Sequence, residues 1–270
     1  MTYTHLEIER SGHVVTCALS NPPRHTLNAL GVVELSQMLD EVESDPSVRV
    51  LVLTGAGEGV FVAHYEVNEL ADAAEQQGAG PAGPAPGDES GLHGFHQLLL
   101  RLERLHAVTI AALNGSAAGG GCELSLGCDF RLMADGPFGY GLPETLVGII
   151  PGGGGTQRFA RLLGTARALD LILHGRILSP AEALEIGLVH RVFSADSFRD
   201  QVAAFAADLA GRAPLALAAA KRAIHEGSRL TLEQGLVVEQ ACFGQVMGSK
   251  DAAGAMRAFL AGESYEWQGK

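Results

Sequence analysis

A run of glycines leads directly into an apolar segment in the middle of the chain, at residues 115–129 (GSAAGGGCELSLGCD). Each glycine lowers the stability of a helix or strand by about 0.5–1 kcal/mol, so a run of them needs a structural or functional reason. The preceding VTIAALNG is typical of a strand, so we expect a strand, a turn of small residues and a short helix. The amides of Gly119, Gly120 and Gly121 would then be unpaired donors at the helix start, suited to binding a developing negative oxygen.

Two glutamates stand beside glycine-rich backbone. Glu123 lies on the first turn of the expected helix, where the helix dipole explains a carboxylate as well as a function does. Glu144 follows Pro143 and precedes a second glycine run, in GYGLPETLVGIIPGGGGTQR. Two carboxylates in otherwise apolar sequence are suited to acid and base chemistry on a substrate activated at a carbonyl.

Other chemistries find little support in the sequence. VLVLTGAGEG has Val60 where a dinucleotide-binding turn needs its third glycine, and no G-x-S-x-G motif occurs. We interpret the HxxH pair His93 and His96 as solvated loop histidines, because no carboxylate partner is near. The four cysteines lack metal-ligand spacing and indicate free, buried thiols, so no metal site is expected.

Composition limits the partners and the location. A chain of 270 residues that is 47% hydrophobic can bury one substantial core. The net charge of −12 argues against a nucleic-acid partner. The start of the chain has no leader pattern, and no apolar run approaches the roughly 18 residues of a membrane helix. We therefore expect a soluble, cytoplasmic protein without a membrane partner.

Strand and helix patterns alternate through the first half of the chain. We expect strands at 6–9, 13–20, 48–55, 107–115 and 130–134, and helices at 30–44 and 120–128. The helix at 30–44 should place one apolar side toward a core: Val33, Leu35, Met38, Leu39 and Val42. This ββα rhythm predicts an α/β stack of related units.

The rest of the chain has two different patterns. Residues 74–91, rich in Gly, Pro and Ala, are expected to form a mobile surface loop. From residue 153 onward the pattern is almost wholly helical. Helices this apolar are expected to pack against neighbouring subunits.

Several segments together resemble one known family. They are NPPRHTLNAL, FVAHYEVNEL, AALNGSAAGGGCELSLGCDFRLMA, FGYGLPETLVGIIPGGGGTQRFARLLG, ILSPAEALEIGLVHRV and DAAGAMRAFLAG. In order and spacing they resemble the crotonase superfamily, and most closely an enoyl-CoA hydratase, over nearly the whole chain.

The resemblance implies a fold, an activity and an assembly. The fold would be a crotonase-like β/α spiral of repeated ββα units over residues 1–200, followed by a helical C-terminal oligomerisation region over 201–270. The chain would assemble as a trimer or a dimer of trimers. The activity would be addition of water across the 2,3 double bond of a 2-enoyl-CoA, with no cofactor and with coenzyme A as part of the acyl-CoA thioester substrate.

The resemblance also assigns site residues. The oxyanion hole falls on the backbone N–H groups of Tyr65 and Gly120. Glu123 would act chiefly on the water and Glu144 chiefly on the α-proton, although a close pair titrates as a unit. The implied substrate-binding and CoA-binding residues are Arg24, His25, Leu27, Ala63, His64, Tyr65, Gly119 and Phe259.

The chain departs from the family pattern at two places. His64, Tyr65 and Glu66 stand where Gly, Ala and Asp are usual, so a phenol and an imidazole come near the acyl channel. They would narrow it, add polar contacts or bind a functionalised acyl group; alternatively His64 only packs beside the loop, because His tolerates unusual backbone angles. The usual basic residues after the last helix's Phe are also missing. The donors left for the CoA phosphates are Arg24 and, more weakly, Lys221 and Arg222, each of which is otherwise a solvated surface charge.

Other activities remain open at this point. They are double-bond isomerisation, a hydratase/lyase step on an aryl-propenoyl thioester, and acyl-CoA binding with weak catalysis.

Overall fold

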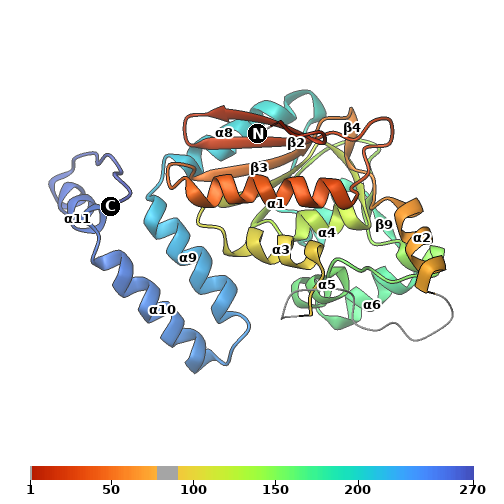
Figure 1. Ribbon diagram of the computed structural model, residues 1–270. Coiled ribbons are helices and arrows are strands. Elements are labelled where there is room, and N and C mark those ends of the chain that lie inside the picture. Colours follow the sequence, from red (N-terminus) through yellow and green to blue (C-terminus); the bar gives the residue numbers. More distant parts are fainter. Residues whose placement is uncertain (1, 78–90) are drawn as a thin grey trace.

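The computed structural model describes residues 2–77 and 91–270, which form two sheets with helices packed around them (Figure 1). The large sheet has the order β1-β2-β3-β5-β7-β10. Only β1 and β2 pair in antiparallel fashion, and the other neighbours are parallel. Its strands are β1 (Leu6–Ser11), β2 (Val14–Leu19), β3 (Val50–Gly55), β5 (Val108–Leu113), β7 (Phe130–Ala134) and β10 (Arg191–Phe193).

The small sheet has the order β4-β6-β8-β9. Its first three strands are parallel and β9 is antiparallel to β8. The strands are β4 (Gly59–Val62), β6 (Gly115–Ala118), β8 (Tyr140–Gly141) and β9 (Ile177–Leu178).

The chain coils by giving successive strands to alternate sheets. β3, β5 and β7 enter the large sheet, and the strand after each of them, β4, β6 or β8, enters the small sheet. Helices follow each pair: α2 (Val67–Gln77) and α3 (Gly94–Arg104), then α4 (Gly120–Leu126), then α5 (Gly155–Leu163). The expected α/β class and the repeated ββα units are confirmed.

The small sheet is the part of the fold that the sequence pattern missed. Gly115, expected as the end of the preceding strand, and residues 116–118, expected as a turn of small residues, form a separate strand, β6. A Cβ added at Gly115 would lie 1.8 Å from the carbonyl carbon of Gly59, so only glycine permits this close pairing of β6 with β4. β8 and β9 have two residues each, too short to show a strand period.

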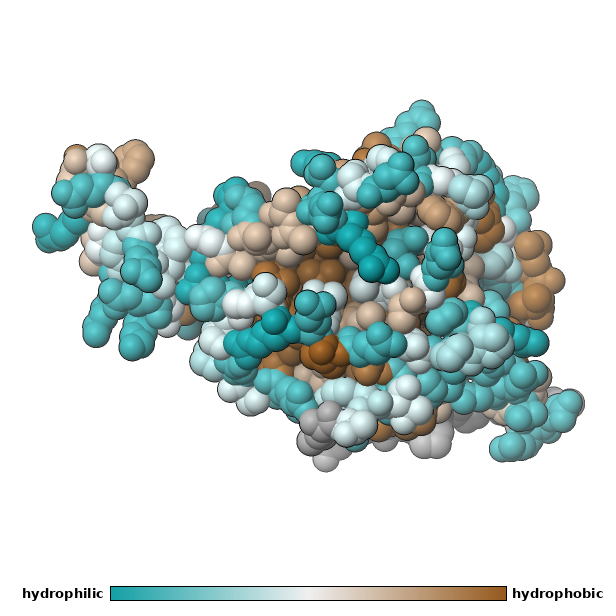
Figure 2. Space-filling model, turned by 90° about the horizontal axis from the view of Figure 1, so that it is seen from above, coloured by the Kyte–Doolittle hydropathy of each residue, from teal (hydrophilic) through white to brown (hydrophobic). Residues whose placement is uncertain are grey.

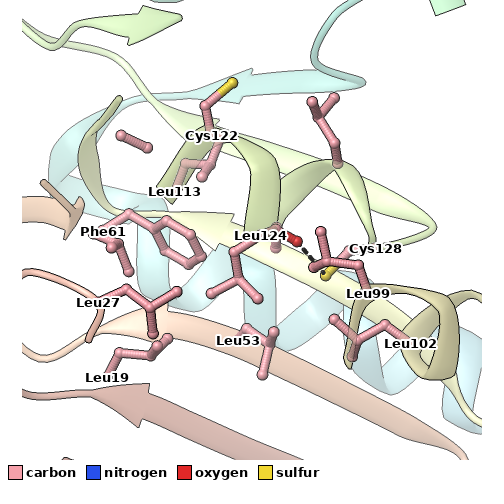
Figure 3. Packing of buried hydrophobic residues seen from close by; sticks show 14 of the residues in the cluster. Leu19, Leu27, Leu53, Phe61, Leu99, Leu102, Leu113, Cys122, Leu124 and Cys128 are labelled. Atoms are coloured by element: carbon pink, nitrogen blue, oxygen red, sulfur yellow. Dashed lines mark hydrogen bonds between the residues drawn. The ribbon is translucent and has the colours of Figure 1, made fainter. Parts of the chain in front are cut away.

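The main core lies under α1 (Ala29–Ser44), whose N-cap Asn28 accepts a hydrogen bond from the amide of Gly31. Four of the five expected core residues of this helix are buried. The exception is Val33, which is 51% exposed, while its neighbour Val32 is buried. Figure 3 shows the core side chains that meet here from several elements, among them Leu19, Leu27, Leu53, Phe61 and Leu124. The four cysteines are free and buried, as expected.

Helices dominate after residue 153, although β9 and β10 interrupt the expected helical pattern. The short helix η1 (Glu144–Val147) precedes this part, and the elements that follow α5 are α6 (Thr165–Leu173), α7 (Pro180–Glu185), η2 (Ala195–Ser197), α8 (Phe198–Ala210), α9 (Pro214–Gly227), α10 (Leu232–Met247) and α11 (Lys250–Ala261). Phe198, Val202 and Ala206 of α8 belong to a core cluster on the large sheet, so the core continues past residue 200. α2 extends to Gln77, which makes residues 74–77 of the expected loop helical; residues 78–90 lie outside the described part.

The last two helices form an arm. α10 and α11 extend away from the body in Figures 1 and 2. The face of the body in Figure 2 is a mixture of hydrophilic and hydrophobic residues, and the hydrophobic ones are visible both near its centre and at its edge. Large apolar side chains such as Phe243 and Phe259 are exposed on this arm. In the described ranges, no single helix has the length and composition to cross a membrane; residues 195–210 and 214–227 meet the criterion only as a pair bent by 100°.

Lys221 anchors α9 to the body. Lys221 as a whole is only 8% exposed. Its ammonium group lies 2.8 Å from Oδ2 of Asp129 and donates to the carbonyls of Leu102 and Ala107. Burial alone would raise the pKa of Asp129, but hydrogen bonds and charge from His225 and Lys221 hold it below its usual value. Lys221 is therefore not a solvated charge available to a phosphate, contrary to the sequence expectation. Arg222 is likewise engaged, with its Nε 3.2 Å from Cys242 Sγ.

Replacing Lys221 with Met is expected to lower the free energy of unfolding by about 3–5 kcal/mol, because it removes the buried cation beside Asp129 and leaves that carboxylate only its hydrogen bonds with Thr109 and His225. Urea denaturation followed by circular dichroism measures the change. Arg212→Met, which removes an exposed i,i+4 partner of Asp208, is the control and should change stability by under about 1 kcal/mol. An equal effect of both variants would contradict the anchoring role.

Candidate active site

A cavity of about 810 Å³ opens where the small sheet, the helices after it and the start of α1 meet. Its walls are mostly apolar. Six of the expected site residues line it: His64, Tyr65, Gly119, Gly120, Glu123 and Glu144. They come from three places in the chain, namely the segment after β4, the turn between β6 and α4 with the first turn of α4, and the segment after β8.

Tyr65 and Gly120, the two residues expected to supply oxyanion-binding amides, lie in contact at one side of the cavity. A Cβ added at Gly120 would lie 3.1 Å from the amide nitrogen of Tyr65 and 2.9 Å from its Cβ, so the two residues are in contact. Leu27 forms an isolated parallel β-bridge with Tyr65: the N–H of Leu27 donates to His64 O, and its C=O accepts from the amide of Glu66. In such a parallel bridge the N–H of Tyr65 itself points away from Leu27. Within the described part of the chain, neither the Tyr65 amide nor the Gly120 amide donates to a backbone carbonyl.

Gly119 has a different role from the one expected of its amide. That amide is paired, because it donates to Gly141 O at 3.0 Å. Gly119 has φ 51° and ψ −123°, a conformation that side chains oppose, and a Cβ there would lie 3.1 Å from Oε1 of Glu144. Glycine at this position turns the chain into α4 and makes room for the Glu144 carboxyl group.

Glu123 is held by the second glycine run. The residue is 3% exposed, and its Oε1 accepts hydrogen bonds of 2.7 Å from the amides of both Gly153 and Gly155. A Cβ at Gly153 would lie 2.6 Å from Oε2, which explains why glycine is needed there. Burial raises the pKa of Glu123 above its usual value, although the amides of Gly155 and Gly153 oppose the rise.

Glu144 is the first residue of η1 and faces the same cavity. Its Oε2 is buried and has no hydrogen-bond partner in the described structure. Burial and, to a smaller extent, the charge of Glu123 raise the pKa of Glu144 to about 7. The two carboxyl groups therefore share one cavity and influence each other's ionisation.

The Tyr65 phenol lies at the cavity wall. Its ring centroid is 6.3 Å from that of Phe95, and burial together with the Glu69 carboxylate raises its pKa to about 12. Glu69 also accepts a hydrogen bond of 3.0 Å from the amide of Ala29, at the start of α1. Glu69 thus links the phenol and α1.

His64 lines the cavity with ordinary backbone angles. Its Nδ1 lies 2.7 Å from Tyr65 O, so its ring is bound locally. Among the described residues other than glycine, only His25 has a positive φ, 52°. The argument from unusual backbone angles was therefore wrong for His64.

Five expected ligand-binding residues do not line this cavity. Arg24 lies on an exposed turn, and His25 packs against Gly57. Leu27 is in the core (Figure 3), while the amide and carbonyl of Ala63 pair with His25 O and the Ala118 amide. Phe259 is 83% exposed on α11, in the arm. Contact of these residues with CoA stays a prediction.

The cavity also contains residues that the sequence reasoning overlooked. Val33 of α1 and Phe95 of α3 line it, as does the apolar segment Leu146, Val147, Ile149 and Ile150. The signal for the last four was the run LVGII, which has neither a helix nor a strand period.

The expectation that His93 and His96 are solvated loop histidines was wrong. His93 is the N-cap of α3 and lines the cavity, and His96 lies on the first turn of that helix. The helix was missed because glycines and a polar stretch precede it in the sequence.

Comparison with known proteins places this geometry in a family. A model of the family described as "Enoyl-CoA hydratase/isomerase" matches residues 9–270. The chain belongs to this family. Its similarity to individual members extends over nearly the full length.

One relative in the enoyl-CoA hydratase/isomerase family is the short-chain-enoyl-CoA hydratase of Clostridium acetobutylicum, 33% identical over 261 residues that cover 96% of each chain. The crystal structure of an enoyl-CoA hydratase from Bacillus anthracis matches with a TM-score of 0.89 and 34% identity, over 99% of this chain and 100% of that chain. A structure from Geobacillus kaustophilus HTA426 matches with a TM-score of 0.92 and 30% identity, over 100% of this chain and 98% of that chain. The fold is therefore that of this family.

Proposed function

We propose that this member of the family adds water across the 2,3 double bond of a 2-enoyl-CoA. The thioester oxygen accepts hydrogen bonds from the amides of Tyr65 and Gly120, which stabilise the negative charge that develops there. Glu123 removes a proton from the attacking water, whose oxygen bonds to the β-carbon. Glu144 delivers a proton to the α-carbon, which yields the 3-hydroxyacyl-CoA.

One observation supports the proposal: two residues in contact, whose amides donate to no backbone carbonyl in the described part of the chain, line a single cavity together with two carboxyl groups. Glu144, whose pKa is raised to about 7, is suited to hold a transferable proton near neutral pH. Glu123, fixed by two amide donors at one oxygen, keeps its other oxygen available for water.

The acyl group that fits best is apolar. In the described part of the chain, the only carboxylate or cationic side chains lining the cavity are Glu123 and Glu144, apart from imidazoles. A charged acyl substituent would therefore lose its hydration without gaining an ion-pair partner. The Tyr65 phenol and Phe95 ring lie at the wall and allow an aromatic substituent to stack, which keeps an aryl-propenoyl thioester as the second candidate.

Product analysis with crotonyl-CoA tests the proposal. Hydration yields 3-hydroxybutyryl-CoA and loses the absorbance of the conjugated enoyl thioester. A shifted double bond would instead identify an isomerase. Tight binding without turnover would identify an acyl-CoA-binding protein.

The pH dependence of the reaction is a second prediction. The working form of the pair carries one proton, so kcat/KM for hydration is expected to fall about tenfold per pH unit above pH 7, where Glu144 ionises. The equilibrium constant between enoyl-CoA and 3-hydroxyacyl-CoA does not change with pH. The kcat/KM for dehydration must therefore fall above pH 7 in the same way. Initial rates from about pH 6 to pH 9 in both directions check this; a flat profile above pH 7 would contradict it.

The wider context follows from the sequence. We propose that the chain acts in the cytoplasm as a trimer or a dimer of trimers and that the reaction needs no added cofactor, since amides and carboxyl groups supply the required chemistry. The exposed apolar side chains of α10 and α11 support association of subunits through the arm. Arg24 remains the first candidate for the CoA phosphates.

A further inference from the structure

The HxxH pair, which the proposed reaction does not use, contacts the loop that holds Glu123. His93 Nε2 lies 2.9 Å from the carbonyl oxygen of Gly152. His96 stacks on His93 with 3.7 Å between ring centroids and 21° between planes. His93 therefore contacts this carbonyl group directly, and the His96 ring packs against His93.

That carbonyl belongs to the peptide unit whose N–H binds Glu123. The carbonyl of Gly152 and the N–H of Gly153 are parts of one planar peptide group and point in opposite directions. The N–H donates to Oε1 of Glu123 at 2.7 Å. A donor fixed to the carbonyl thus determines where the N–H points.

This peptide unit needs such a constraint because glycine stands on both sides of it. Gly152 and Gly153 have no Cβ to oppose rotation of the peptide plane. A rotation by about 180° would turn the carbonyl oxygen toward the Glu123 carboxylate and remove one of its two donors. Arg158 Nη1 contacts Gly153 O at 3.3 Å, one peptide further along, and does not hold the Gly152 carbonyl.

We propose that His93, supported by His96, is a positioning residue that locks the Gly152–Gly153 peptide so that its N–H remains directed at Glu123. The inference rests on the proposed function, because it takes Glu123 as the base.

The protonation of the two rings fits this role. His93 Nδ1 accepts from the amide of His96, so in the neutral ring Nε2 carries the hydrogen and donates to Gly152 O. Burial and the neighbouring His93 and Arg158 lower the pKa of His96, which favours its neutral form.

The test compares three side chains at position 93 in a His96→Phe background, which keeps an aromatic ring for stacking and removes the second imidazole. His93→Asn keeps an N-cap acceptor for α3 but is too short to reach Gly152. His93→Gln places an N–H donor near the position of the imidazole Nε2. His174→Asn, at the exposed end of α6, is the control for loss of a histidine.

With crotonyl-CoA, His93→Asn is expected to lower kcat about tenfold relative to the background chain, with KM unchanged, and His93→Gln to restore most of it. Crystal structures are expected to show the Gly152–Gly153 peptide rotated in the Asn variant alone. An unchanged kcat in the Asn variant would overturn the inference. A change confined to KM would also overturn it, because that would indicate direct contact of His93 with the substrate. The same holds if the His93→Gln variant has an unchanged unfolding midpoint but does not recover kcat.

The failure of the proposed function has a different signature. If the unmodified chain does not hydrate enoyl-CoA thioesters, the proposed function is wrong. The peptide orientation in the crystal structures then still decides whether His93 locks the loop.

Discussion

Glu144→Gln is expected to lower kcat for hydration by about 10²–10⁴-fold, because the amide cannot deliver a proton to the α-carbon. Gln fills nearly the same volume, so KM and stability should change little. Glu123→Gln is expected to be similarly severe, since it removes the base that activates water. The double variant should lose little more than the worse single variant, because the two carboxyl groups act as a unit.

Steady-state kinetics with crotonyl-CoA measure these effects, and circular dichroism checks the fold of each variant. Glu66→Gln is a suitable control: Glu66 accepts from the Thr26 hydroxyl and lies on the loop next to Tyr65, and it does not line the cavity. Turnover that is insensitive to Glu144→Gln would favour an acyl-CoA-binding protein. An isomerase that uses only one carboxyl group predicts that one of the two variants retains near-normal activity.

Gly120→Ala is expected to lower kcat by about 10²–10³-fold, comparable to the loss of one oxyanion donor. The added Cβ would lie 2.9 Å from Tyr65 Cβ and 3.1 Å from its amide nitrogen, so the two amides must separate. The carboxyl groups remain in place, and the defect should therefore appear in the chemical step.

The matched control is Gly244→Ala in α10, where an added Cβ meets nothing within 4 Å. This substitution should leave kcat unchanged and slightly favour the helix. Single-turnover kinetics separate the chemical step from product release. Equal activity of the Gly120 and Gly244 variants would contradict the role of the two amides.

The sequence predicted the large sheet well because its strands have a clear pattern. VLVLTG and VTIAAL are continuous apolar runs typical of strands covered on both faces, and the structure places them as the neighbours β3 and β5. The small sheet could not be predicted in the same way. GSAA has low intrinsic strand propensity, and β6 exists because Gly115 allows close approach to β4.

Part of the site was predictable because the glycine runs are a clear signal in the sequence. Glycine runs mark places where the backbone approaches another group, and the first run pointed to residues 119–120. The second run was noted only as the neighbour of Glu144, so the contact of Gly153 and Gly155 with Glu123 was not predicted. The sequence could not show that the Gly119 amide is paired with Gly141, since β8 has only two residues. It also could not show that His93 reaches Gly152, because 59 residues separate them and neither segment has a periodic pattern.

The alternation of strands between the two sheets has a consequence for how such a catalyst can change. Tyr65, Gly120 and Glu144 each follow a strand of the small sheet, β4, β6 and β8, so each successive coil of the chain contributes its own group to a common point. A substitution in one ββα unit can change the shape of one wall of the cavity, while the other units keep their groups in place. The side chains of His64 and Tyr65 after β4 would be such a local change: they leave the backbone amides and the two carboxyl groups unaltered and change which acyl groups fit the cavity.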